Sequence, residues 1–152
     1  MLPGKARAEI DTLVSRTRGA EVGVEEREHE YLEQRAKDFL NTAKEKWEAG
    51  LYHLAAFCVE QYLQLYLKAV LCRLAGDYPK THGIRRLLRG LAEVTGKQAD
   101  VEDFIAQHAV LLGDIEDAYI TSRYIPRDFE QEEVLAMLHF AEALTTAVER
   151  WR

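Results

Sequence analysis

The chain has 152 residues, of which 47% are hydrophobic and 30% charged, and its formal net charge is −6. This length suits one domain with one core, and the balance of apolar and charged residues excludes wholesale disorder. The net negative charge argues against indiscriminate binding to a nucleic-acid backbone, although it is compatible with a local basic patch. Only three prolines and nine glycines interrupt a sequence rich in helix-forming residues, so we expect an all-α protein.

The N-terminal sequence and the two cysteines bear on cellular location. Residues 1–24 mix basic side chains with isolated apolar ones and do not resemble a signal peptide. Cys58 and Cys72 stand 14 positions apart, about 21 Å along one helix, which is too far for a disulfide between them. We interpret them as buried thiols and expect a cytoplasmic protein without a membrane span. An intermolecular disulfide is the alternative.

The first predicted elements are an arm and a long helix. Residues 1–24 hold one short apolar turn that two glycines then break, so we interpret them as an N-terminal arm, partly helical or mobile. A bundle follows over residues 25–152. Its first helix is predicted from about Val24 to Ala49, because apolar side chains recur there every three or four residues and form one stripe. These are Leu32, Ala36, Phe39, Leu40, Ala43 and Trp47.

The second predicted helix, from Leu51 to about Ala75, is apolar on nearly every side. Its polar side chains occupy about a third of the circumference. They are His53, Glu60, Gln61, Gln64 and Lys68. A helix of this kind must be covered all round, by its own bundle or by a second copy of the chain.

Further helices complete the prediction. Thr81 is expected to cap a third helix, and Asp100 a fourth that runs to about Tyr119. Asp128, with Gln131 three residues later, has the pattern of a capping box for a last helix. No strand is predicted. The expected fold class is therefore all-α, an up-and-down bundle of four to five antiparallel helices with short connections.

Three segments resemble parts of one known family. The first is 55–64, where small residues precede Glu-Gln, with Lys68 following. The second is the turn 78–82, Tyr-Pro-Lys-Thr-His, and the third is 117–126, which ends in Arg-Tyr-Ile-Pro. In this order and spacing they resemble the HEPN domain (higher eukaryotes and prokaryotes nucleotide-binding), of the type associated with minimal nucleotidyltransferases. The resemblance covers residues of about 30–150.

The resemblance implies a helical bundle, often dimeric, that is frequently encoded beside a minimal nucleotidyltransferase and acts as a ribonuclease in other branches. Those ribonuclease branches have an arginine, four to six intervening residues and then a histidine. No histidine of this chain has an arginine at that spacing, so we assign no catalytic residue. Because such bundles pair, we expect the strip through His53, Glu60, Gln64 and Lys68 to lie at or near a twofold interface.

Seven residues are candidates for binding a nucleotide, a phosphate or a partner: Arg123, Tyr124, Glu60, Lys68, His82, Arg85 and Arg86. Arg123 ends a helix, where a guanidinium can clamp a phosphate, and the alternative is an ion pair with a carboxylate such as Glu60 or Asp117. Glu60, Gln64 and Lys68 are spaced by four and line one helix edge. That edge either borders a nucleotide pocket or forms a wet or interface stripe.

His82 opens a basic segment. Residues 80–97 hold five Lys and Arg against one acid, whereas 98–122 hold six Asp and Glu and no Lys or Arg. A helix N-terminus beside arginines suits an anion, so a nucleotide or RNA phosphate is one interpretation. The alternative is that the two segments attract each other or complement a partner chain. No histidine has metal-ligand spacing with an acid or a cysteine, so we assign no metal and no cofactor.

The function hypothesis follows from these features and from the resemblance. We expect a non-enzymatic homodimer that partners a nucleotidyltransferase in a toxin–antitoxin-like or regulatory pair and contributes to a nucleotide or RNA site. One alternative is a ribonuclease with a variant site, such as Arg123 with His82 or His139. The other is a stand-alone nucleotide-binding module that uses the basic third helix.

Overall fold

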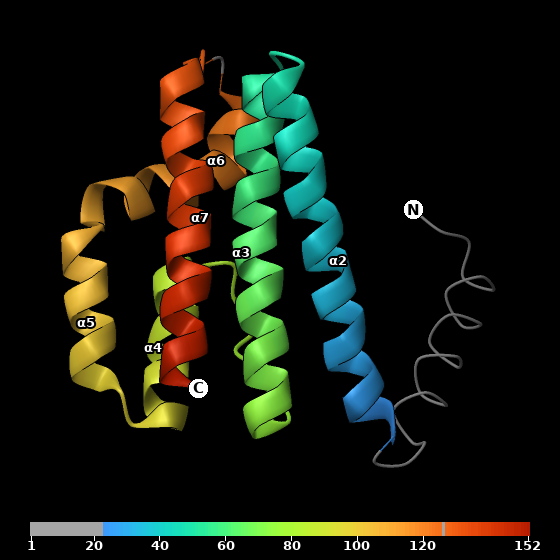
Figure 1. Ribbon diagram of the computed structural model, residues 1–152, viewed down its shortest axis with the longest axis vertical. Coiled ribbons are helices and arrows are strands. Elements are labelled where there is room, and N and C mark those ends of the chain that lie inside the picture. The colour runs from blue at the N-terminus through green and yellow to red at the C-terminus, as the bar shows by residue number, and fades with distance from the viewer. Residues whose placement is uncertain (1–22, 126) are drawn as a thin grey trace.

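The computed structural model describes residues 23–125 and 127–152, and these form α-helices without any strand (Figure 1). The predicted all-α class is thereby confirmed. The helices are α2 (Gly23–Glu48), α3 (Tyr52–Ala75), α4 (Ile84–Thr95), α5 (Gln98–Gln107), α6 (Ala109–Tyr124) and α7 (Gln131–Trp151). Apart from its last two residues, which begin α2, the predicted arm lies outside the described residues. None of the described helices has both the length and the hydropathy that crossing a membrane requires.

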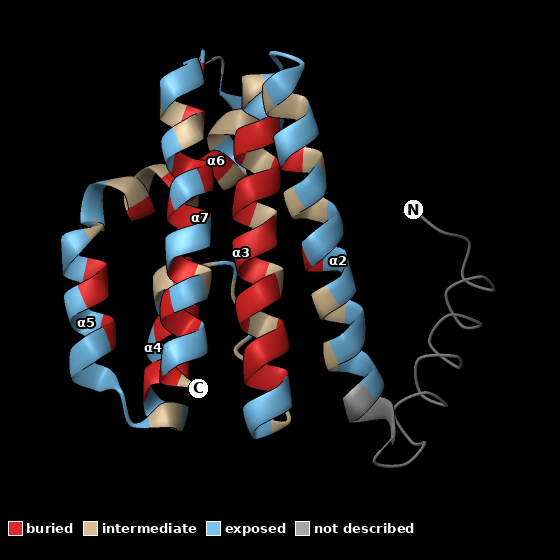
Figure 2. Ribbon diagram, in the orientation of Figure 1, coloured by how far each residue is buried: buried red, intermediate tan, exposed pale blue. Residues whose placement is uncertain are grey.

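Helix α3 is the centre of the bundle. It lies between α2 and α7 in Figure 1, and α4 and α6 also pack against it. Fourteen of its 24 residues are buried, and its ribbon in Figure 2 is accordingly mostly red. The chain's own helices therefore cover the helix that is apolar all round.

The polar strip of α3 corrects one expectation. Glu60 and Gln64 are only 0% and 6% exposed within a single chain. They are thus neither a wet stripe nor a surface open to a second copy, because α2, α4, α6 and α7 together enclose this part of α3. His53, at the start of α3, is exposed, and Lys68 is half-buried.

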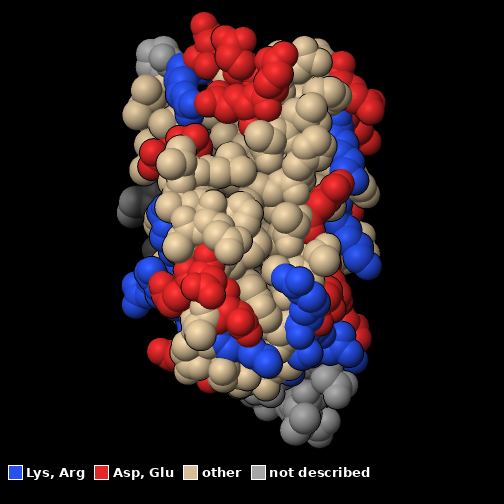
Figure 3. All heavy atoms as spheres, turned by 60° about the vertical axis from the view of Figure 1, so that its left-hand side comes forward, with Lys and Arg blue, Asp and Glu red and all other residues tan. Residues whose placement is uncertain are grey.

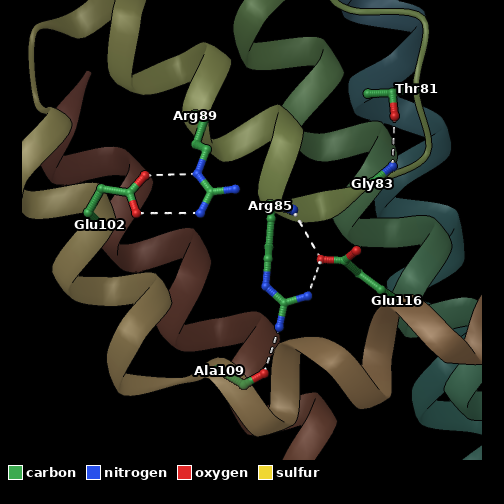
Figure 4. Close-up of polar contacts among 7 residues, drawn as sticks. All are labelled: Thr81, Gly83, Arg85, Arg89, Glu102, Ala109 and Glu116. Carbon is green, nitrogen blue, oxygen red and sulfur yellow. Dashed lines mark hydrogen bonds and ion pairs between the residues drawn. The ribbon is translucent and has the colours of Figure 1, made fainter.

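A glycine stands at each end of α4. Gly96 ends the helix as a left-handed residue with φ 73°, a backbone conformation that glycine adopts without strain. The N-cap is Gly83, so the prediction of Thr81 is wrong. The Thr81 hydroxyl instead accepts a hydrogen bond of 3.1 Å from the Gly83 N–H and holds the turn that precedes the helix (Figure 4).

The other two predicted caps are also wrong. Asp100 lies in the first turn of α5, which begins two residues earlier. Helix α7 begins after Glu130, with no side-chain cap, so Asp128 does not form a capping box. Phe129 is buried in the core next to it. A buried ring therefore precedes α7, and no side chain caps its first turn.

The predicted helix from Val101 to Tyr119 is two helices. His108 separates them, with φ −119° and ψ 22°. Its Nδ1 donates a hydrogen bond of 2.9 Å to the Phe104 carbonyl oxygen, and its ring packs 4.3 Å from that of Phe104 and 5.3 Å from that of Phe140. These contacts anchor the chain at the corner from which α6 runs to α3.

Candidate functional site

The Glu60 carboxylate is fully enclosed beneath the surface where α3 meets α6. Gln61 Nε2 donates a hydrogen bond of 2.8 Å to its Oε2, and Gln64 Nε2 donates one to its Oε1. Among the described residues no cation forms an ion pair with it. Burial raises the pKa of Glu60 to about 7, against the lowering effect of the two amides and of the charges of Arg123 and Lys68.

Arg123 lies at the surface beside this carboxylate, in the last turn of α6. Its Nε donates a hydrogen bond of 2.9 Å to the Tyr119 carbonyl oxygen. Its guanidinium carbon lies 4.4 Å from the ring centre of Tyr119, 4.9 Å from that of Tyr124 and 5.4 Å from that of Phe57. The alternative expected from the sequence, an ion pair with Glu60 or Asp117, does not form. The guanidinium is held by aromatic faces instead.

Tyr119 also contacts His82, from the segment before α4. The two rings stack at 4.5 Å with an interplanar angle of 12°. Three parts of the chain therefore meet at this surface: α3, α6 and the segment that leads to α4. We refer to Phe57, His82, Tyr119, Arg123 and Tyr124 together as the Arg123 cluster.

Two lysines extend the positive charge along α3 toward its C-terminal end. Lys68 Nζ lies 5.7 Å and Lys80 Nζ 4.6 Å from the ring centre of Tyr78. Burial lowers the pKa of Lys68, the charge of Glu60 raises it, and the neighbouring charge of Lys80 lowers it further. Cations and aromatic rings thus alternate over this surface.

The arginines of α4 are in a different situation, because they are paired within the chain (Figure 4). Arg85 Nη1 donates to Glu116 Oε1 at 3.1 Å, its backbone N–H donates to the same oxygen at 3.3 Å, and its Nη2 donates to the Ala109 carbonyl oxygen at 2.7 Å. Arg89 Nε donates to Glu102 at 2.8 Å. Helix α4 is thereby attached to α6 and α5, and a carboxylate already occupies the helix N-terminus where the sequence suggested an external anion.

Comparison with known families identifies the bundle. The family model of the HEPN domain matches residues 29–151. The chain belongs to the HEPN family. This places it among helical domains related to nucleotides or RNA, and it confirms the resemblance seen in the sequence. No curated protein and no solved structure matches the chain.

The HEPN bundle brings together only part of the predicted set. Arg123, Tyr124 and His82 lie in one cluster above Glu60, and Lys68 is two turns further along α3. Arg85 is engaged elsewhere. Arg86 is exposed and has no hydrogen bond or ion pair with the rest of the described chain.

The face that holds α4 and α5 is not a basic patch. Figure 3 shows acidic and basic side chains intermixed there around a broad uncharged area. Arg85 pairs with Glu116 and Arg89 with Glu102 between α4 and its neighbours α6 and α5. This pairing matches the alternative in which the basic and acidic segments attract each other.

Sequence reasoning missed Tyr119 and Phe57. Tyr119 precedes Arg123 by four residues, the spacing at which two side chains meet on one face of a helix, so a search for cation–aromatic pairs would have found it. Phe57 lies 66 positions before Arg123 and on another helix. Only the packing of α3 against α6 reveals that contact.

A cavity of about 470 Å³ opens where α3 begins and α6 ends. His53, Ser122 and Arg127 are among its lining residues, and Arg127 is held there by an ion pair with Glu133 and by the ring of Phe129 at 4.4 Å. None of the seven predicted site residues lines it. The cavity and the Arg123 cluster are therefore separate features of the HEPN fold.

Proposed function

We propose that this HEPN protein is a non-catalytic partner of a nucleotidyltransferase and that it binds a nucleotide or RNA at the Arg123 cluster. The observation that best supports the site is an exposed guanidinium set among aromatic rings, without a carboxylate in contact. A guanidinium free of a carboxylate keeps its affinity for phosphate.

The aromatic side chains of the cluster suit the base of a nucleotide ligand. Tyr124 is 71% exposed, so its ring is open to a base. Base–aromatic stacking beside positive charge is the usual mode of binding single-stranded nucleic acid. Lys68 and Lys80 provide further positive charge near the same surface.

The partner role rests on the family resemblance and on exposed apolar side chains. Ile120, Tyr124 and Ile125, at the end of α6, are 49%, 71% and 52% exposed. Exposed apolar groups beside a ligand site suit a protein contact. In this proposal a cytoplasmic homodimer assembles with the nucleotidyltransferase in a toxin–antitoxin-like or regulatory pair.

Titration with ATP and with a short oligoadenylate tests the binding site. Arg123→Ala is expected to weaken binding of both about tenfold or more, since it removes the phosphate contact. Arg35→Ala is the matched control, because Arg35 also lies over a tyrosine four residues before it, Tyr31, at 5.2 Å, but on α2. Equal affinities of the two variants would refute the assignment.

The partner role has its own test. The chain and a nucleotidyltransferase encoded beside it should elute as one complex after co-expression, at a mass larger than that of either alone. Separate elution at micromolar concentration would exclude the partnership and would leave the ligand site to be judged by the titrations.

One observation favours a second candidate function, ribonuclease activity. Tyr119 contacts both His82 and Arg123, which are 41 positions apart in sequence. In that arrangement His82 would act as a general base toward a ribose 2′-hydroxyl, and Arg123 would stabilise the charge that develops on the phosphate. Cleavage of labelled RNA that His82→Ala abolishes would support this activity, and inert wild-type protein would exclude it.

A further inference from the structure

Glu60 is a buried carboxyl group that has no cation in contact with it in the part of the chain that the structure describes. It is 0% exposed, and its two oxygens accept hydrogen bonds from Gln61 and Gln64, which are neutral. A buried carboxylate normally has a cation in contact, because desolvation of a charge is costly. Glu60 has only amides in contact, so its charge is compensated by groups that lie further away.

Those groups belong to the surface described above. Among the described residues, the charged groups that act on Glu60 are Arg123 from α6 and Lys68 from α3. Lys80, from the segment between α3 and α4, acts on Lys68 in turn. His82, from the same segment, is the histidine of the cluster and stacks on Tyr119. No charge of α2, α4 or α7 is among those that act on Glu60.

A phosphate held by Arg123 would change this balance. It would place negative charge close to a buried carboxylate and would neutralise the main cation that compensates it. Both effects favour the protonated form of Glu60. In the absence of a ligand, the ionised carboxylate attracts Arg123 and Lys68 toward α3, in competition with a phosphate.

We propose that Glu60 is a proton-linked positioning residue of the Arg123 cluster: a phosphate-bearing ligand binds at Arg123 together with a proton that the Glu60 carboxylate takes up. This inference rests on the proposed binding site and adds that the pH regulates the affinity of that site. Affinity should therefore rise as the pH falls. The proton comes from solvent and is released again when the ligand leaves.

The test is the affinity for a short oligoadenylate with hydroxyl ends, whose phosphodiesters keep one charge between about pH 6 and about pH 8. Wild-type protein should bind about tenfold more weakly at the higher pH. Glu60→Gln should bind with the same affinity at both, because the amide cannot ionise. Glu45→Gln, on the exposed face of α2, should keep the wild-type pH dependence.

Two further measurements separate Glu60 from His82 as the origin of the pH dependence of binding. His82→Gln should retain the pH dependence even if its affinity is lower, since the proton is assigned to Glu60. Calorimetric titration of the wild-type protein in two buffers of different ionisation enthalpy should show proton uptake on binding, which requires no variant to fold.

The outcomes distinguish this inference from the proposed site. No binding of the oligoadenylate at any pH would refute both. Binding without proton uptake, or a pH dependence that survives Glu60→Gln and disappears in His82→Gln, would refute the role of Glu60 and leave the Arg123 site intact.

Discussion

Two regions of this HEPN bundle hold arginines that the sequence marks as candidates for binding phosphate, and the structure treats them differently. On α4, Arg85 and Arg89 pair with carboxylates of α6 and α5. At the Arg123 cluster, the guanidinium contacts aromatic rings and the Tyr119 carbonyl oxygen, and the enclosed Glu60 carboxylate forms no ion pair with it. Arg85 and Arg89 are therefore part of the scaffold, whereas Arg123, on α6, is exposed among aromatic rings.

The difference shows that a count of charged residues along the chain does not by itself locate a binding site. Residues 80–97 form a basic stretch of the sequence, and residues 98–122 form an acidic stretch that follows it directly. These two stretches meet in the fold, where Arg85 and Arg89 of the basic one attach α4 to α6 and α5. A single arginine beside aromatic rings has little weight in such a count, yet it is better placed to bind phosphate.

The largest expected effect concerns the buried carboxyl. The pKa of Glu60 is raised by burial from its ordinary value near 4.5 to about 7. Its contribution to stability is therefore complete below about pH 4.5 and is lost as the pH rises through about 7. Glu60→Gln removes this loss, so at about pH 8 it should increase the free energy of unfolding by roughly 3 kcal/mol.

Urea unfolding at two pH values checks this prediction. The gain should vanish near about pH 4, where the carboxyl of both the folded and the unfolded chain is protonated. An equal effect at both pH values would show that the variant acts through packing and not through ionisation.

The next effect is on ligand binding. Tyr124→Ala removes an exposed ring on which a base would stack, so affinity for oligoadenylate should fall by about 2 kcal/mol with the free energy of unfolding unchanged. Tyr31→Ala, on α2, is the control, because Tyr31 is also exposed beside an arginine. Loss of affinity in both variants would argue for nonspecific binding.

Replacement of the paired arginines of α4 should change the free energy of unfolding and not the affinity for the ligand. Arg85→Ala leaves the half-buried Glu116 without its cation and frees the Ala109 carbonyl oxygen, so the free energy of unfolding should fall by about 1 kcal/mol. Arg89→Ala removes a pair that is exposed on both sides, and its effect should be too small to resolve in urea unfolding. A larger loss for Arg89 than for Arg85 would contradict this ranking.

Local sequence patterns predicted the centre of the fold well. The end of α3 at Gly76 follows from a glycine with φ 78°, and the burial of α3 follows from its apolar composition. The break at His108 had no such signal, because no glycine or proline marks it. It depends on contacts of the histidine ring with Phe104 and Phe140, the latter on α7.

The site was predictable where local sequence motifs mark its residues, and not where it depends on contacts between distant helices. Arg123, Tyr124 and His82 were found from local motifs, and the structure brings them together. The partner of Arg85 was not predictable, because Glu116 is 31 residues away and on another helix. The enclosure of Glu60 was missed since a polar strip on a helix ordinarily faces water, and the packing of the neighbouring helices on α3 covers it.

The most direct test compares Arg123→Ala with Arg85→Ala in two measurements, oligoadenylate affinity and urea unfolding. Arg123→Ala should lose affinity about tenfold or more and keep its stability within about 0.5 kcal/mol. Arg85→Ala should keep its affinity and lose stability. If Arg85→Ala weakens binding as much as Arg123→Ala does, or if Arg123→Ala binds like wild type, the assignment of ligand binding to the Arg123 cluster is wrong.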